Sequence, residues 1–233
     1  MIKKMPAAIA AAFPHTIPVM TGFAFLGMAY GILMSSAGYG WYWILLTSAL
    51  VFAGALQFVG ISLLASVFDP IYAFLIAIMV NARHLFYGIS MLEKLSDIGK
   101  IKTYVIFAMC DETFSILVSV EPPPDIDKRA FMFSVAALNQ SYWIIGGVIG
   151  GLIGPLLTFD TSGIEFVMTA FFVVIFINQW QTQKKHFPAL IGLGAAIVSL
   201  LIFGAEHFII PAMVLIIACL TVFKGRFFEE VEE

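Results

Sequence analysis

Uninterrupted apolar segments of about twenty residues recur along this chain and restrict its fold more than any other feature. The hydrocarbon core of a bilayer is about 30 Å thick, and a helix of about twenty residues crosses it. Strands of a membrane barrel would instead alternate apolar and polar residues over about ten positions. Of the residues, 61% are hydrophobic and only 12% are charged, about half the charge of an ordinary soluble domain. The chain is therefore predicted to be an all-α integral membrane protein.

Turn residues and charges divide the sequence into about eight predicted transmembrane spans, or seven if the third does not fully cross. The whole chain, residues 1–233, is expected to form one polytopic helical bundle. Residues 1–16 are expected to form a cytoplasmic lead-in that Pro14 ends, and residues 224–233 a charged cytoplasmic tail. The last two spans are short and are expected to form a tight hairpin. The expected spans are residues 18–36, 41–66, 70–92, 101–120, 131–157, 164–180, 187–203 and 208–223.

Basic residues in the short loops indicate the orientation of the chain, because cytoplasmic loops carry an excess of Lys and Arg. With eight spans and both termini inside, the inner segments hold eight basic residues: Lys3, Lys4, Lys128, Arg129, Lys184, Lys185, Lys224 and Arg226. The outer loops then hold three, namely Lys94, Lys100 and Lys102. This excess predicts cytoplasmic termini, and the loop after the third span is an exception to the rule.

Polar residues interrupt the third predicted span near its centre, where Asn81, Arg83 and His84 lie within four consecutive positions. Successive helical residues point about 100° apart, so a regular helix would turn one of these side chains toward lipid. A local break avoids this where the freed backbone lines a cavity. The sequence therefore predicts a discontinuous helix near Asn81. The alternative is that Arg83 extends to the membrane surface, but that surface is roughly 15 Å away by helical rise.

Two acidic residues, Asp111 and Glu112, lie near the centre of the fourth predicted span. Ionisable residues inside a membrane pair with one another or line a polar path, so one of the acids is expected to pair with Arg83. Adjacent residues diverge on a helix, which gives the two carboxylates different roles. In one interpretation Asp111 lines a substrate path, and Asp111, Glu112 and His84 carry protons. In the other, the charges form a structural ion pair between the two spans.

Uncharged polar residues in other spans are candidates for a binding site or for helix packing. Gln57 in the second span, and Asn139 and Gln140 in the fifth, are each able to contact a substrate or to form an interhelical hydrogen bond. Glycines interrupt the first and fifth spans, and the spacing of Gly27 and Gly31 allows two helices to approach closely. His84 lacks partners at metal-ligand spacing, so no metal or cofactor is expected.

The sequence does not contain the motifs of common hydrolases or nucleotide-dependent proteins. Neither Gly-x-Ser-x-Gly, His-Glu-x-x-His nor Gly-x-x-x-x-Gly-Lys-Ser/Thr occurs, which argues against an intramembrane hydrolase and an ATP-driven subunit. Because no nucleophile–base pair is recognisable, an enzyme is not expected.

Three motifs connect the chain to a known family. They are Ala53-Gly54-Ala55-Leu56-Gln57-Phe58, Asn81-Ala82-Arg83-His84-Leu85-Phe86-Tyr87-Gly88 and Asp111-Glu112-Thr113-Phe114. In these motifs, their order and the span pattern, the chain resembles the AzlC/YgaZ family of large subunits of bacterial branched-chain amino acid exporters. The resemblance implies a transporter domain of the bacterial inner membrane that exports valine, leucine, isoleucine and sometimes methionine. It also implies a small AzlD/YgaH-type membrane subunit as partner. A higher oligomer is a further possibility, and no nucleic acid partner is expected.

An amino acid substrate would fit the charges of the third and fourth spans. The carboxylate of a zwitterion suits Arg83 or a half-helix N-terminus, and its ammonium group suits Asp111 or freed backbone carbonyls. Phenylalanines and methionines are expected to supply an apolar pocket for the side chain. Export against a gradient needs coupling, and proton antiport through Asp111, Glu112 or His84 is the hypothesis. A non-transporting scaffold subunit and an uncoupled channel are the alternatives.

Overall fold

The structure is a computed structural model in which the chain forms two compact units, Met1–Met168 and Thr169–Glu233. All regular secondary structure in its described residues is helical, as the sequence predicts. By length and composition, three helices in that part of the chain are able to cross a bilayer: Met5–Ser36, Lys128–Leu156 and Phe187–Gly204. The described residues are 5–228 except 66, 68, 82, 158–165, 167–168, 171–172, 174–175, 178–179 and 182–185.

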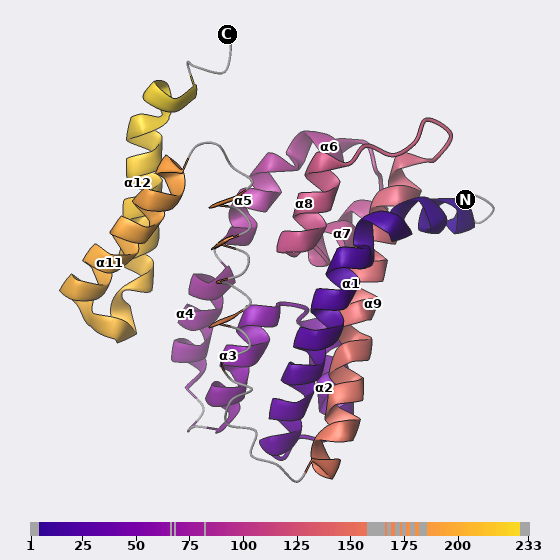
Figure 1. Cartoon of the computed structure of the whole chain (residues 1–233), viewed down its shortest axis with the longest axis horizontal. Coiled ribbons are helices and arrows are strands. Elements are labelled where there is room, and N and C mark those ends of the chain that lie inside the picture. The colour runs from indigo at the N-terminus through magenta and orange to yellow at the C-terminus, as the bar shows by residue number, and fades with distance from the viewer. Residues whose placement is uncertain are drawn as a thin grey trace. The chain divides into compact units, whose positions relative to one another are not determined.

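Two long helices, α1 (Met5–Ser36) and α9 (Lys128–Ile153), pack side by side in the first unit and run parallel (Figure 1). The carboxylate of Asp127 caps α9 by accepting a hydrogen bond from the backbone N–H of Arg129, with N and O 2.8 Å apart. A short 3-10 helix, η2 (Gly154–Leu156), continues α9. Both helices are long enough to extend across a membrane, and the rest of the unit is arranged around them.

The first predicted span is longer than expected. α1 contains Pro14 and Pro18 and ends at neither. Residues 5–16, which were expected to form part of a separate lead-in, belong to the same helix as the span that follows. The predicted boundary at Pro14 is therefore wrong.

Glycines bring α1 and α9 into close contact. A Cβ atom added to Gly27 would lie 2.9 Å from the carbonyl oxygen of Trp143. One added to Gly31 would collide with the carbonyl oxygen of Gly147. These glycines are therefore used for close backbone packing, and the two glycine-rich spans are continuous helices rather than interrupted ones.

The second predicted span consists of two half-length helices, α2 (Trp41–Leu50) and α3 (Gly54–Ala65). The chain turns between them at Phe52, whose φ of 42° is left-handed. The hydroxyl of Tyr39, before α2, donates a hydrogen bond to the carbonyl oxygen of Leu64, near the end of α3, over 3.3 Å. A continuous helix would separate these two residues by roughly 37 Å. α3 therefore runs back toward the end of the bundle where α2 begins, and the pair is called the first hairpin.

The fourth predicted span is divided in the same way, into α7 (Ile101–Phe107) and α8 (Asp111–Ser119). Lys94, which precedes α7, donates hydrogen bonds to the carbonyl oxygens of Leu117 and Val118 near the end of α8, over 3.1 and 3.0 Å. The end of α8 thus returns to the side from which α7 begins. These two helices form the second hairpin.

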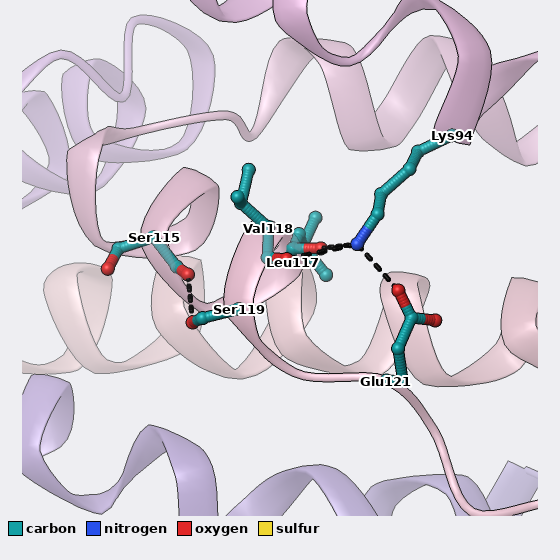
Figure 2. Close-up of polar contacts among 6 residues, drawn as sticks. All are labelled: Lys94, Ser115, Leu117, Val118, Ser119 and Glu121. Atoms are coloured by element: carbon teal, nitrogen blue, oxygen red, sulfur yellow. Dashed lines mark hydrogen bonds and ion pairs between the residues drawn. The ribbon is translucent and has the colours of Figure 1, made fainter. Parts of the chain in front are cut away.

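Figure 2 shows how Lys94 fastens the end of the second hairpin. Its ammonium group, besides binding the two carbonyls, lies 2.7 Å from the carboxylate of Glu121. In the preceding turn, the hydroxyl of Ser119 donates to the carbonyl oxygen of Ser115 over 2.5 Å. The two bonds from Lys94 occupy carbonyls that the last turn of a helix leaves without backbone partners.

Three helices connect the two hairpins: α4 (Pro70–Asn81), α5 (Arg83–Ser90) and α6 (Leu92–Ser96). The predicted interruption near Asn81 falls on Ala82, which lies outside the described residues. Residue numbers increase in the same direction along α5 and α8. Asp111, the first residue of α8, contacts Arg83 at the start of α5, and Phe114 stacks on Tyr87 further along it. Leu117, near the end of α8, contacts Lys94 in α6, the helix that follows α5. α5 and α8 therefore run in the same direction.

The two hairpins lie toward opposite ends of the α1–α9 pair, and both are bound to the middle of α9 (Figure 1). The side-chain amide of Gln140 donates to the carbonyl oxygen of Ala49 in α2 over 3.0 Å and accepts from the hydroxyl of Tyr104 in α7 over 2.6 Å. The amide of Asn139 donates to the hydroxyl of Thr113 in α8 over 3.0 Å. Two consecutive side chains thus connect α9 to both hairpins.

The expectation of continuous helices over residues 41–66 and 101–120 is therefore wrong. The longest of the four half-length helices has 12 residues, or about 18 Å, against a hydrocarbon core of about 30 Å. Apolar composition predicted helices in these segments correctly, but the chain turns back at the centre of each. The predicted count of eight transmembrane spans treats each of these two segments as a helix that crosses the membrane.

The second unit contains α11 (Phe187–His207) and α12 (Ile209–Phe228), which pack together as the hairpin expected at the end of the chain. Gly204, with φ 72°, marks a kink near the end of α11. The predicted sixth span, residues 164–180, lies mostly outside the described residues, as does the end of the charged tail, residues 229–233.

Candidate functional site

Arg83 and Asp111 form an ion pair in the first unit, with Nη1 and Oδ2 2.8 Å apart. Arg83 is the first residue of α5 and Asp111 is the first residue of α8. Asp111 directly follows the turn of the second hairpin, where Cys110 has an extended backbone and precedes the helix. The pairing expected from the sequence is present, and Asp111 is the acid that forms it.

Tyr87 binds the other oxygen of the same carboxylate. Its hydroxyl donates a hydrogen bond to Oδ1 of Asp111 over 2.9 Å, and its ring stacks on Phe114 with centroids 4.4 Å apart. Tyr87 follows Arg83 by four positions, so both side chains project from one face of α5. One helix face therefore holds both oxygens of Asp111.

His84 and Asn81 lie next to this group. Nδ1 of His84 is 3.1 Å from the carbonyl oxygen of Asn81, so Nδ1 carries the proton in that contact. The imidazole ring packs edge-on against Tyr87 with centroids 5.5 Å apart. Asn81 thus contributes its backbone carbonyl, and His84 contacts the tyrosine that binds Asp111.

The ion pair is partly exposed within the first unit: 35% of the Arg83 side chain and 32% of the Asp111 side chain are exposed. Asp111 and the half-buried Glu112 occupy the first turn of α8. Free N–H groups and the helix dipole favour negative charge at this position. The site therefore combines a guanidinium, two carboxylates and an imidazole on two short helices.

The remaining predicted site residues bond to other groups of the first unit. Gln57 is 5% exposed; it accepts a hydrogen bond from Nε1 of Trp143 over 2.9 Å and donates one to the hydroxyl of Ser48 over 3.4 Å. Asn139 and Gln140 connect α9 to the hairpins. All three residues form hydrogen bonds between helices, as expected if they serve helix packing rather than substrate binding.

Sequence reasoning assigned no role to Tyr87, Tyr104 or Thr113. The position of Tyr87, one helical turn after Arg83, is a signal that could have identified it. Tyr104 and Thr113 carry no such signal, because their contacts with Gln140 and Asn139 depend on the turn of the second hairpin.

Half-length helices that meet inside a helical membrane bundle are typical of secondary transporters. They place non-helical backbone where neighbouring protein, rather than lipid, satisfies it. Charged residues within such segments mark paths for substrates or ions. The fold and the site together define the class as multi-pass helical membrane transport proteins.

The family model described as AzlC protein matches residues 18–157, and the chain belongs to this family. The branched-chain amino acid transport protein AzlC of Bacillus subtilis is 51% identical over 94% of this chain and 86% of its own length. An uncharacterized membrane protein of Haemophilus influenzae is 44% identical over 89% and 85% of the two chains. The inner membrane protein YgaZ of Escherichia coli is 25% identical over 92% and 89%. No solved structure matches the chain.

Proposed function

We propose that this chain is a secondary transporter that exports valine, leucine and isoleucine, with methionine as a further substrate, across the bacterial inner membrane. The observation that carries the proposal is the ion pair of Arg83 and Asp111, one third exposed and located on two short helices of a membrane bundle. A relative that is 51% identical is named for branched-chain amino acid transport. The direction of transport follows the family resemblance.

A zwitterionic amino acid carries the same two charges as this ion pair. Its carboxylate replaces Asp111 as the partner of Arg83, and its ammonium group then pairs with Asp111. Partly exposed ion pairs contribute about 1 kcal/mol or less, whereas each charge-assisted hydrogen bond to the substrate is stronger than a neutral one. Tyr87 holds Oδ1 of Asp111 while Oδ2 changes its partner.

Export against a concentration gradient requires a coupled ion, which we take to be the proton. Asp111 and Glu112 share the first turn of α8, and His84 packs on Tyr87. A protonated Asp111 carries no charge and does not hold an ammonium group. Proton binding from outside therefore releases the substrate outside, and the next substrate displaces the proton on the inner side. Glu112 and His84 carry protons to and from Asp111.

Cytoplasmic termini are supported by the distribution of basic residues in the first unit. Met5 contacts Ser134, so α1 and α9 begin at the same end of the bundle. Both ends of the second hairpin lie at that end as well, because Ile98 and Leu117 share a buried cluster with Ala12 of α1 and Phe131 of α9. The basic residues located there are Lys94, Lys100, Lys102, Lys128 and Arg129. With both hairpins turning back, the loop after the third span no longer contradicts the positive-inside rule.

A small AzlD/YgaH-type membrane subunit is part of the proposed transporter, on the basis of the family resemblance. Reconstitution of the purified chain into liposomes, with and without such a subunit, measures its contribution. The molecular mass of the purified protein in detergent, measured before reconstitution, shows whether the chain forms a higher oligomer.

Efflux of valine from vesicles that contain the wild-type chain or a variant tests the proposal. Asp111→Asn removes one charge and keeps the side-chain size, whereas Arg83→Gln removes one charge and keeps a shorter polar side chain. Because a hydrogen bond to a charged group contributes about 1.5–3 kcal/mol, each variant is expected to lose at least about tenfold in efflux while the protein still inserts. Glu121→Gln removes a carboxylate from the other ion pair and is expected to retain wild-type efflux.

Three other outcomes would contradict the proposal. Wild-type efflux in both charge variants would remove the ion pair from the mechanism. Absence of efflux from the wild-type chain, even together with the small subunit, would favour a non-transporting scaffold. Flux that does not saturate and ignores the pH gradient would favour an uncoupled channel.

A further inference from the structure

An apolar pocket of about 250 Å³ lies beside the first hairpin, within the first unit. Four helices form its walls: α1, both helices of the first hairpin, and α4. Most of the lining is aliphatic. The polar lining residues are Tyr30, Thr47 and Gln57. The smallest lining residues are Gly60, Ala73 and Ala77.

The polar groups on the wall of this pocket already have partners. The hydroxyls of Tyr30 and Thr47 bond to each other over 2.8 Å. Both ends of the Gln57 amide are bonded, to Trp143 and Ser48. A pocket whose polar groups are satisfied favours a hydrocarbon group over a polar one, because a new polar group would have to be desolvated without gaining a partner.

Small residues determine the free volume of the pocket. A Cβ atom added to Gly60 would meet no heavy atom within 4 Å, and α4 contributes only the methyl groups of Ala73 and Ala77. An apolar cavity of about 150 Å³ binds benzene. The larger pocket in this chain therefore accommodates a branched side chain of three or four carbons.

One helix, α4, extends from the wall of the pocket toward the charged site. Ala77 precedes Asn81 by one helical turn, or about 6 Å, and the carbonyl of Asn81 contacts His84. Thr47 lines another wall of the pocket. It lies two residues before Ala49, whose carbonyl accepts a hydrogen bond from Gln140 at the middle of α9. The part of the pocket formed by Thr47 and Ala77 is thus near the middle of the bundle, where helical transporters bind their substrates.

We propose that this pocket receives the aliphatic side chain of the transported amino acid, and that Gly60, Ala73 and Ala77 limit the size of that side chain. The inference rests on the proposed function, since it assigns the apolar part of the substrate whose charged part binds Arg83 and Asp111. Among the residues that the structure describes, those lining the pocket include neither a phenylalanine nor a methionine, which differs from the lining expected from the sequence.

The experiment compares efflux of alanine, valine, leucine and isoleucine from vesicles that contain the complete chain. Gly60→Leu fills the pocket from α3, and Ala77→Leu fills it from α4. Each buried methylene changes affinity by about fourfold, so both variants are expected to lower the leucine-to-alanine efflux ratio by at least about tenfold. Gly60→Ala adds a single methyl group and is expected to lower this ratio less than Gly60→Leu does.

Gly194→Leu is the matched control, because Gly194 also lies within a helix and a Cβ there meets no atom within 4 Å. It is expected to leave all efflux ratios unchanged. Ratios measured within one preparation do not depend on the amount of inserted protein.

Two results would overturn the inference and leave the proposed function standing. The first is an unchanged leucine-to-alanine ratio in both filled variants. The second is an equal loss for all four amino acids, which is the result expected if a lipid acyl chain fills the pocket. Failure of the wild-type chain to transport any of the four would instead overturn the proposed function itself, and this inference with it.

Discussion

Tyr87 and Arg83 bind the same carboxylate through its two oxygens, so the position of Asp111 depends on both. A carboxylate held on one side only would rotate when a substrate takes the guanidinium from it. Tyr87 is therefore a positioning residue in the proposed mechanism, because it acts on the substrate through Asp111.

Replacing Tyr87 by phenylalanine removes the hydroxyl and keeps the ring that stacks on Phe114. Because a hydrogen bond to a charged group is worth about 1.5–3 kcal/mol, Tyr87→Phe is expected to lower valine efflux at subsaturating concentration about tenfold. The melting temperature in detergent should fall by several degrees through loss of the same bond, while the packing of the ring is retained. Initial rates over a range of valine concentrations measure the effect and show whether affinity or maximal rate changes.

Tyr72→Phe provides the control for Tyr87→Phe. Tyr72 is 55% exposed and lies on the adjoining helix α4. Removal of the Tyr72 hydroxyl should have no effect on efflux. Equal efflux from the Tyr87→Phe variant and the wild type would show that the hydroxyl does not position Asp111 for transport.

At the scale of helical elements, the two hairpins are the main difference between prediction and structure. Residues 41–66 and 101–120 are apolar enough to cross a membrane, and hydropathy is the same whether a segment crosses or turns back. The turn of the first hairpin includes Phe52 in a left-handed conformation that a bulky residue rarely adopts. Its ring is 6% exposed and packs against Phe23. Tertiary packing therefore overrides the local preference of this residue.

The second hairpin depends on Lys94, whose ammonium group binds two carbonyls at the end of α8 and the carboxylate of Glu121 (Figure 2). The hydrogen bond from Lys94, and then its charge, hold the pKa of Glu121 below its ordinary value of about 4.5. Folding therefore favours the ionised carboxylate. This stabilisation is fully present above the ordinary carboxyl pKa and is lost as the pH falls through the lowered pKa of the folded state.

Glu121→Gln is accordingly expected to lower the melting temperature slightly at pH 7, because exposed ion pairs are screened, and not at all well below pH 4. Lys94→Met also removes the bonds to both carbonyls, so it should lower the melting temperature more than Glu121→Gln and at both pH values. Thermal unfolding in detergent at low salt measures these differences. Equal effects of the two substitutions at neutral pH would mean that the carbonyl bonds of Lys94 do not stabilise α8.

At the scale of the whole molecule, the hairpins change the membrane topology. If all eight predicted spans crossed, residue 67 would be cytoplasmic and residue 100 external. With both hairpins turning back, residue 67 is external and residue 100 is cytoplasmic. The orientation proposed for the termini is the same in both cases, so these two loops distinguish the topologies.

Single cysteines at Val67 and Lys100 test this difference in a background where Cys110 and Cys219 are replaced by alanine. Val67 is 97% exposed and Lys100 is also exposed. A membrane-impermeant maleimide added to whole cells is expected to label Val67→Cys and to spare Lys100→Cys. Ala37→Cys should be labelled and Asp125→Cys spared in either topology. Labelling of Lys100→Cys but not of Val67→Cys would show that the second and fourth segments cross the membrane.

The sequence by itself determined the membrane environment, the helical class, the family and the charged residues of the site. The family was identified by the resemblance of three motifs. The other properties follow from composition, from the length of apolar segments, and from the cost of placing charges such as Arg83 and Asp111 in hydrocarbon. Only the tertiary structure decided which apolar segments turn back, which acid pairs with Arg83, and where an apolar pocket opens. A turn inside a membrane bundle is stabilised by groups that are distant in the sequence, as the contacts of Gln140 with Ala49 and Tyr104 show. Such contacts cannot be predicted from the local sequence around the turn.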